Sequence, residues 1–184
     1  MKTSFFDYFP ILQPEDNIIL RQITTADAKD YFEYMNNAQV AKYLSGTNLP
    51  HSLEHSISEL QYWSSVFSSR RSIYWGIALK DSNKLIGTTG FNNLWRTHAR
   101  ADLSYDLNFD YWGLGIMHRS LENILDFAKN EMGVLRVQAS TVVSNDRSFK
   151  LLTKLGFEQE GIMRKYEYLH EEYQDARLLS KILI

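Results

Sequence analysis

The sequence predicts one mixed α/β (α+β) domain in which helices pack on a β-sheet. The chain has 184 residues and is 44% hydrophobic, which is enough for one well-formed core but short for two domains. Apolar residues alternate with period two in some segments and recur at helical spacing in others. No Gly/Ser-rich linker or internal repeat divides the sequence. We therefore expect a single domain over residues 1–184, with residues 1–16 as an N-terminal lead.

The first half of the chain is expected to form strands on either side of two helices. NIILRQI has the character of a strand, and TTADAKDYFEYM shows helical spacing behind a threonine cap. HSLEHSISELQYWSSVF is a second helical pattern, after which the turn-like DSN joins two strands into a β-hairpin. In chain order these predicted elements are a strand at 17–23, helices at 24–35 and 51–67, and strands at 72–80 and 84–94.

The second half is expected to alternate strands and helices and to end in two strands. Gly133 lies where the cap of the long helix is expected, Asn145 can cap the short helix, and Gly156 can terminate it. The polar segment HEEYQ separates the last two strands. The predicted elements are strands at 99–109, 135–143, 157–169 and 175–183, and helices at 115–132 and 145–155.

Composition excludes several kinds of function. The absence of cysteine removes disulfides, thiolate metal ligands and a cysteine acyl-enzyme. A net charge of −2 argues against a generic nucleic-acid binder. No stretch approaches the roughly 20 apolar residues of a membrane span, and the first residues lack a continuous apolar segment, so we expect a cytoplasmic protein without membrane contact. His51 and His55 have no third ligand nearby in sequence, so we expect no metal site.

Two glycines one residue apart, in DYWGLGIMHRSL (110–121), lie between a predicted strand and a predicted helix. Glycines at a helix N-terminus allow a phosphate to approach several backbone N–H groups. The alternative is an ordinary turn that needs positive φ, and these few residues do not decide between the two.

Two familiar phosphate-binding motifs do not match this chain. The dinucleotide fingerprint fails because its third glycine position is His118 and no ribose-binding acid follows. The P-loop spacing from Gly156 to Gly161 continues Ile162-Met163 and lacks the lysine. A nicotinamide enzyme and a nucleoside triphosphatase are therefore disfavoured.

The order of motifs resembles the GNAT N-acetyltransferases. The matching set is the WGLGIM turn, a long helix, the strand RVQAS, N-x-x-S from Asn145, L-G-F from Leu155, E-G from Glu160, Arg164 and Asp175. It is more narrowly similar to the ribosomal-protein N-terminal acetyltransferases of the RimJ/RimL type, from about Asn17 to the C-terminus. The resemblance implies a mixed, mostly antiparallel seven-stranded sheet with about four flanking helices. It also implies that two central strands, 101–107 and 136–142, splay apart around acetyl-CoA.

The resemblance implies a cofactor site built largely from backbone. The family's pyrophosphate loop, Q/R-x-x-G-x-G/A, falls on residues 112–117, with Trp112 in place of Gln or Arg and Met117 in place of the small residue. Neither departure removes an amide, and Trp112 is open to a packing or a ligand-stacking role. The implied cofactor-binding residues are Leu107, Trp112, Gly113, Leu114, Gly115, Ile116, Met117, His118 and Asn145.

The resemblance also implies roles for the side chains that do the chemistry. Ser148 matches the hydroxyl that protonates the leaving thiolate, and Glu167 matches a glutamate thought to act as base through a water. Ser148 as a capping-turn residue and Glu167 as a solvated strand carboxylate remain alternatives. Asp102, Tyr105 and Asp106 on the central strand are expected to contact the acceptor. Alternation places the two aspartates on one face, and they are secondary candidates for receiving the amine's proton or its charge.

Direct attack by an amine on the thioester needs no nucleophile from the protein. An α-amine, with a pKa of about 7.7–8, needs less help from a base than lysine at about 10.4. We therefore expect a protein N-terminal amine, such as that of a ribosomal protein, as acceptor. A small-molecule amine and a non-catalytic CoA-binding module remain alternatives. Relatives of this kind are often dimers, which leaves a homodimer open, and Glu160 is expected to be structural, paired with Arg164.

Overall fold

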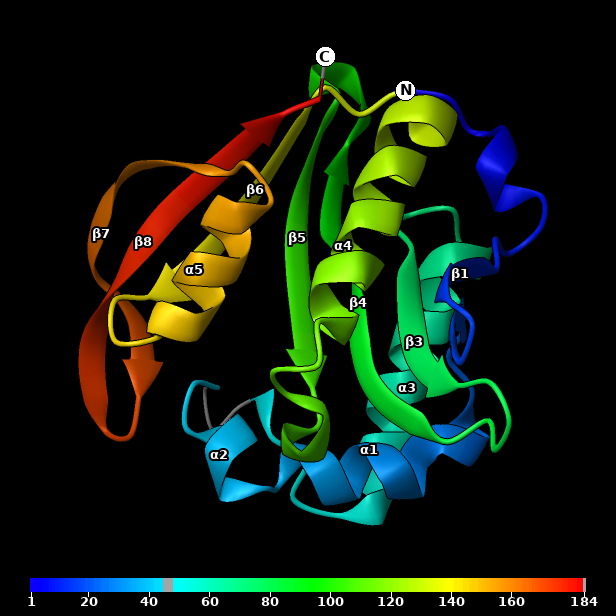
Figure 1. Ribbon diagram of the computed structural model, residues 1–184, viewed down its shortest axis with the longest axis horizontal. Helices are drawn as coiled ribbons and strands as arrows, with labels where there is room; N and C mark the ends of the chain where they lie inside the picture. Colours follow the sequence, from blue (N-terminus) through cyan, green and yellow to red (C-terminus); the bar gives the residue numbers. More distant parts are fainter. Residues whose placement is uncertain (45–47, 184) are drawn as a thin grey trace.

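The computed structural model describes residues 1–44 and 48–183, which form an eight-stranded mixed sheet (Figure 1). The spatial order is β1-β2-β3-β4-β5-β6-β8-β7. Neighbouring strands are antiparallel except for the central pair, β5 and β6, which is parallel. The strands are β1 (Leu12–Glu15), β2 (Ile18–Gln22), β3 (Tyr74–Leu79), β4 (Leu85–Trp95), β5 (Arg100–Leu107), β6 (Arg136–Val142), β7 (Glu158–Leu169) and β8 (Glu172–Ile182).

Helices cover both faces of this sheet. Figure 1 shows α4 and α5 in front of it, α3 behind it and α1 at its lower end. Within the described residues the helices are α1 (Ala28–Met35), α2 (Ala38–Ala41), α3 (Leu53–Ser68), α4 (Ile116–Phe127) and α5 (Asp146–Lys154). A π-helical turn, Ala128–Met132, extends α4 to Gly133, which caps it with φ +70° as the sequence predicts. No helix in the described ranges is long and apolar enough to cross a membrane.

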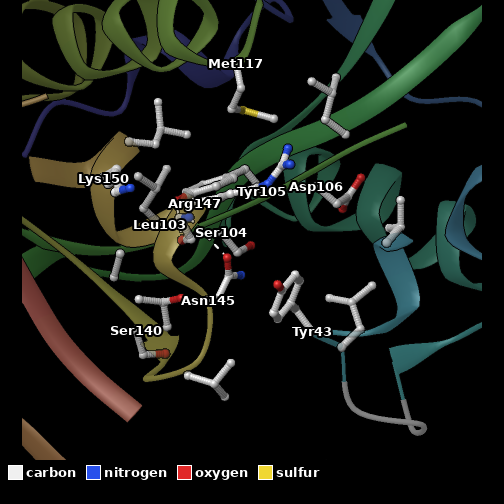
Figure 2. Close-up of a pocket in the computed structure, with 18 of the residues that line it drawn as sticks. Tyr43, Leu103, Ser104, Tyr105, Asp106, Met117, Ser140, Asn145, Arg147 and Lys150 are labelled. Atoms are coloured by element: carbon white, nitrogen blue, oxygen red, sulfur yellow. Dashed lines mark hydrogen bonds between the residues drawn. The ribbon is translucent and has the colours of Figure 1, made fainter. Parts of the chain in front are cut away.

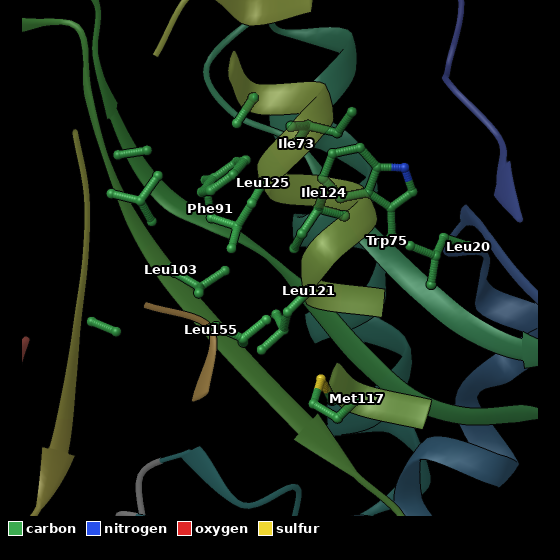
Figure 3. Packing of buried hydrophobic residues seen from close by; sticks show 14 of the residues in the cluster. Leu20, Ile73, Trp75, Phe91, Leu103, Met117, Leu121, Ile124, Leu125 and Leu155 are labelled. Carbon is green, nitrogen blue, oxygen red and sulfur yellow. The ribbon is translucent and has the colours of Figure 1, made fainter. Parts of the chain in front are cut away.

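The main core lies between α4 and the sheet. The apolar face of α4 places Leu121 and Ile124 against Trp75 and Phe91 of the inner strands, and all four side chains are fully buried (Figure 3). A second buried cluster on the opposite face joins α1 and α3 to β3 and β4. Both faces of β3 are therefore covered, which explains its continuous apolar run YWGIAL.

The N-terminal lead contributes to the fold more than the sequence predicts. Residues 12–15 form β1, an antiparallel edge strand on β2, so the sheet has eight strands rather than seven. Phe6 is buried against Phe67, and the Trp75 indole N–H donates to the Pro10 carbonyl at 2.9 Å. The short helix α2 was also not predicted.

The last two strands are closer in sequence than predicted. HEEYQ (170–174) does not form a loop of five residues. Its last three residues, 172–174, belong to β8, and Glu172 already pairs with Leu169 of β7. The turn is His170–Glu171, with φ values of 50° and 66°. Positive φ at both central residues is typical of a type I′ turn, which joins antiparallel strands tightly.

The two central strands splay apart, as predicted. β5 and β6 pair from Arg100↔Arg136 to Asp102↔Gln138. Beyond Asp102, β5 continues alongside β4 to Leu107, and β6 continues alongside β8 to Val142. The described structure gives no pairing between β5 and β6 in this part, so the sheet opens from Leu103 onwards.

Candidate active site

A cavity of about 930 Å³ occupies the opening between β5 and β6. Its walls come from these two strands, the N-terminus of α4, helix α5 and strand β7. Figure 2 shows part of this lining, with labelled side chains from β5, β6, α4 and α5. Its volume lies at the upper end of the range for small-molecule sites, which suits a long ligand. Of the predicted site residues, Asp102, Tyr105, Asp106, Leu107, Trp112, Gly113, Gly115, Ile116, Met117, His118, Asn145, Ser148 and Glu167 line it. Leu114 does not, and its side chain is 60% exposed.

Residues 113–118, called the amide loop below, present backbone N–H groups at the start of α4. Gly113 and Gly115 both have φ +79°, a conformation that other residues rarely adopt. Gly115 is the N-cap of α4 and provides no side-chain cap. Across the described chain, none of the N–H groups from Gly113 to His118 donates to an acceptor. The turn therefore needs positive φ, and it also leaves amides free at the positive end of a helix dipole, a position that favours anions.

The two departures from the family's loop pattern have clear structural roles. Met117 is buried in the main core beside Leu121 at the start of α4, and it also lines the cavity (Figure 3). The Trp112 indole N–H donates to the Leu107 carbonyl at 2.8 Å, and the ring packs edge-on against Phe109. The Arg147 guanidinium lies over the Trp112 ring, 5.0 Å from its centroid. Trp112 thus packs under the end of β5 while one side of it borders the cavity.

Two hydroxyl groups meet inside the opening. The Tyr105 hydroxyl of β5 and Ser148 Oγ of α5 are 2.7 Å apart. Asn145 Oδ1 accepts from the Ser148 backbone N–H at 3.1 Å, which makes Asn145 the N-cap of α5 and fixes the helix start beside the cavity. Burial raises the pKa of Tyr105 to about 12, so its hydroxyl stays protonated at neutral pH. The pair can therefore supply a proton.

The Asp106 side chain lies on the face of β5 opposite Tyr105, where Tyr34 and Thr88 hold its carboxylate. Its Oδ1 accepts from the Tyr34 hydroxyl at 2.7 Å and from the Thr88 N–H at 3.0 Å, and its Oδ2 accepts from the Thr88 hydroxyl at 2.6 Å. Burial nevertheless raises the pKa of Asp106. Asp102, two positions from Ser104 on the same face, accepts from Asn93 at 3.2 Å and also has a raised pKa because of burial. Side-chain alternation thus separates these carboxylates from the Tyr105 side of the strand.

Glu167 reaches the cavity from β7. A β-bulge between Met163 and Glu167 interrupts the pairing with β8 at this point, and Lys165 within it has φ 51°. The Glu167 carboxylate has no hydrogen bond or ion pair to any described residue. Burial raises its pKa, which makes it a stronger base than an ordinary glutamate once it is deprotonated.

Glu160 is not paired with Arg164. Its carboxylate forms two hydrogen bonds with the Arg136 guanidinium, at 2.6 and 2.5 Å, and accepts from the Ser180 hydroxyl. The hydrogen bonds from Arg136, and then that from Ser180, lower the pKa of Glu160 to about 2. Glu160 therefore links β7 to β6 across β8, outside the cavity.

Sequence reasoning missed the basic side chains of α5. Arg147, Lys150 and Lys154 all line the cavity. Figure 2 shows Arg147 and Lys150 on the side of the cavity away from Asp106. Their spacing of three and four residues places them on one helix face, and this pattern could have identified them.

Comparison with known proteins agrees with this geometry. The family model for the acetyltransferase (GNAT) domain matches residues 17–158. The chain is 34% identical over 172 residues to the uncharacterized N-acetyltransferase YoaA of Bacillus subtilis (strain 168), covering 94% of this chain and 96% of YoaA.

Two solved structures have the same fold. The ribosomal-protein-S5-alanine acetyltransferase of Vibrio fischeri is 26% identical, with a TM-score of 0.85 over 95% of this chain and 97% of that one. The ribosomal L7/L12 α-N-protein acetyltransferase RimL, in complex with coenzyme A, has a TM-score of 0.87 at 21% identity, over 95% of this chain and 98% of RimL. With an amide-lined opening between splayed strands and a domain match over most of its length, the chain belongs to the GNAT family and is an N-acetyltransferase.

Proposed function

We propose that the protein transfers an acetyl group from acetyl-CoA to the α-amine at the N-terminus of a protein, with ribosomal proteins as the leading candidates. One observation carries the proposal. A single cavity joins the free N–H groups of the amide loop to the Tyr105–Ser148 hydroxyl pair and to the carboxylates of Asp106 and Glu167. An anion-binding end and an acid–base end therefore belong to the same site.

The residues of the cavity fit acetyl-CoA as co-substrate. The amide loop would hold the pyrophosphate, and the free N–H groups and positive-φ glycines are the observations that support this. Arg147, Lys150 and Lys154 add positive charge to the same cavity from α5. Acetyl-CoA supplies an activated thioester, so the protein needs no covalent intermediate. The bound coenzyme A of the RimL structure supports the same assignment.

Ser148 and Tyr105 are placed to protonate the leaving thiolate. A thiolate of this type has a pKa of about 8.5, so a positioned donor lowers the cost of its departure. In our proposal the Ser148 hydroxyl gives its proton to the sulfur and takes the proton of the Tyr105 hydroxyl, 2.7 Å away, and Tyr105 then recovers a proton from solvent. The raised pKa of Tyr105 keeps that hydroxyl protonated at the pH of the reaction.

Glu167 is the base in this proposal, acting on the incoming amine directly or through a water. Its carboxylate has no partner among the described residues, borders the cavity and has a raised pKa. Asp106 is too fully hydrogen-bonded to be the first acceptor of a proton, because Tyr34 and Thr88 occupy both of its oxygens. We assign Asp106 to electrostatic attraction of the positively charged amine before it loses its proton.

Two classes of amine acceptor suit the acidic end of the cavity. Similarity to the S5-alanine acetyltransferase over nearly the whole chain supports a ribosomal N-terminus, which would be met in the cytoplasm. The acidic lining formed by Asp102, Asp106 and Glu167 also suits a small cationic amine.

An acceptor screen separates these two classes. Acetyl-CoA binding is first measured by calorimetry, and turnover is then followed by thiol release. The acceptors are peptides starting with alanine or serine, their Nα-blocked forms, a polyamine and free amino acids. Turnover of the free peptides alone supports the proposal. Turnover of the polyamine or amino acids alone would show that the acceptor is a small-molecule amine and not a protein N-terminus. If the protein did not bind acetyl-CoA, the proposed function would be wrong.

A further inference from the structure

The N-terminal lead reaches the amide loop through one arginine. Glu15, the last residue of β1, places its Oε2 2.5 Å from Nη2 of Arg119 in the first turn of α4. The same Nη2 donates to the Leu114 carbonyl at 2.9 Å. One guanidinium thus joins an edge strand to the middle of the amide loop.

Gly115 makes room for this guanidinium. A Cβ atom at position 115 would lie 2.6 Å from Nη1 of Arg119. Gly115 therefore provides positive φ for the turn and also space for the arginine against it. The Glu15 and Arg119 side chains are 23% and 38% exposed, so solvent screens their interaction less than that of a fully exposed pair.

The hydrogen bond to Leu114 determines the direction of the next amide. In a planar trans peptide, the carbonyl and the following N–H point in opposite directions. Fixing the Leu114 carbonyl on Arg119 therefore turns the Gly115 N–H away from the arginine. Gly115 borders the cavity, whereas Leu114 does not.

We infer that Glu15 is a positioning residue for acetyl-CoA: it holds Arg119 on the Leu114 carbonyl and so keeps the amide loop in its phosphate-binding conformation. The inference rests on the proposed function, because it takes the ligand of the loop to be the pyrophosphate of acetyl-CoA. It assigns a role in the site to a residue outside the cavity.

The negative charge of Glu15, considered without its role in positioning Arg119, predicts a different effect on acetyl-CoA binding. Glu15 is an anion near the proposed site of a polyanionic ligand, so long-range electrostatics predicts that removing its charge tightens binding. Positioning predicts that removing it weakens binding. The sign of the change therefore distinguishes the two.

The test measures the Kd for acetyl-CoA by calorimetry, with steady-state kinetics on the full chain. We expect E15Q to weaken binding about fivefold and E15A about tenfold, in the usual range for coupled neighbours. The KM for acetyl-CoA should rise in parallel, whereas kcat and the KM of the acceptor should stay unchanged. R119K keeps the charge but loses the planar fork, so it should weaken binding like E15Q.

Asp7 offers a matched control, since it also lies in the N-terminal lead and pairs with an arginine, Arg70, at 2.9 Å. D7N removes the same charge and should leave the Kd unchanged. The double variant E15Q/R119K should have a Kd no higher than that of the single variant that binds acetyl-CoA more weakly. Both substitutions break the same Glu15–Arg119 interaction, so their effects should not add.

Unchanged or tighter binding by E15Q and R119K, with thermal midpoints near that of the wild type, would overturn the inference. If D7N weakened acetyl-CoA binding as much as E15Q, the inference would also be wrong, because loss of any charge in the N-terminal lead would then have the same effect. Failure of the wild type to bind acetyl-CoA is a different result, because it removes the proposed function itself.

Discussion

The two ends of the cavity are built in different ways. The amide loop is six consecutive residues, and its functional groups are backbone N–H groups that any sequence with the right φ values can present. The other end gathers side chains from β5, α5 and β7, with Asp106 and Glu167 far apart in sequence. A backbone site is therefore encoded locally, whereas a side-chain site depends on the register of distant strands. The two ends should accordingly respond to different kinds of substitution.

The largest effect is expected at the hydroxyl pair. Ser148→Ala should lower kcat about 100-fold, because it removes the proposed donor to the leaving thiolate. The Kd for acetyl-CoA should stay within about twofold of the wild type, because the amides are untouched. Stopped-flow and steady-state rates with calorimetry check this prediction. Tyr105→Phe is the companion variant, and a rate for S148A equal to that of the wild type would remove Ser148 from the mechanism.

A somewhat smaller effect is expected at Glu167. Glu167→Gln should lower kcat/KM of the acceptor by about tenfold to a hundredfold, since an α-amine is already partly neutral at pH 7. Because burial raises the pKa of Glu167, the wild-type rate should fall on acidification at a pH above the ordinary glutamate range of about 4.3. The variant should lose this acid limb. Glu158→Gln, an exposed change on the same strand, is the control, and an unaltered pH–rate profile in E167Q would contradict the assignment.

At the amide loop, backbone conformation should matter more than side chains. Gly113→Ala meets no steric obstacle but forces a Cβ into positive φ, at a cost of about 1–2 kcal/mol. We expect acetyl-CoA binding to weaken about tenfold if the loop relaxes. Leu114→Ala should have no effect, because that side chain lies outside the cavity. Equal Kd values for the two variants would mean that the amides do not bind the ligand.

The smallest effect is expected at the ion pair that links β6 to β7. Glu160→Gln should lower the thermal midpoint by about 2–4 °C at pH 7, as is usual for a partly exposed pair. Because the pKa of Glu160 is lowered to about 2, its stabilisation is present above the unfolded pKa of about 4.3 and is lost as pH falls through the folded value. Melting curves of both proteins should therefore converge between about pH 4 and pH 2. A constant difference across this range would contradict the pairing with Arg136.

Sequence reasoning succeeded where the signal is local. Alternation and capping residues predicted the strands from 17–23 onwards and the long helices, and the glycine turn could be interpreted on its own. β1 was missed because Leu12–Glu15 contains Pro14, which is typical of loops and tolerated on edge strands. α2, with four residues, is too short to show a period.

Contacts between distant strands could not be derived in the same way. Glu160 was expected to pair with Arg164, four residues away in the same predicted strand, but four residues of a strand span about 13 Å. The real partner, Arg136, follows from the order β6-β8-β7, which is a property of the whole sheet. The contact between Tyr105 and Ser148 depends likewise on how α5 packs beside the opening.

The bulge in β7 also affects how the molecule meets other copies of itself. β1 and β7 are the outer edges of the sheet, and regular edges can pair with strands of other molecules and aggregate. β1 is short and contains Pro14, while β7 is interrupted at the bulge, where Lys165 carries a charge and a left-handed backbone. The irregularity beside Glu167 therefore makes this edge a poor template for intermolecular strand pairing.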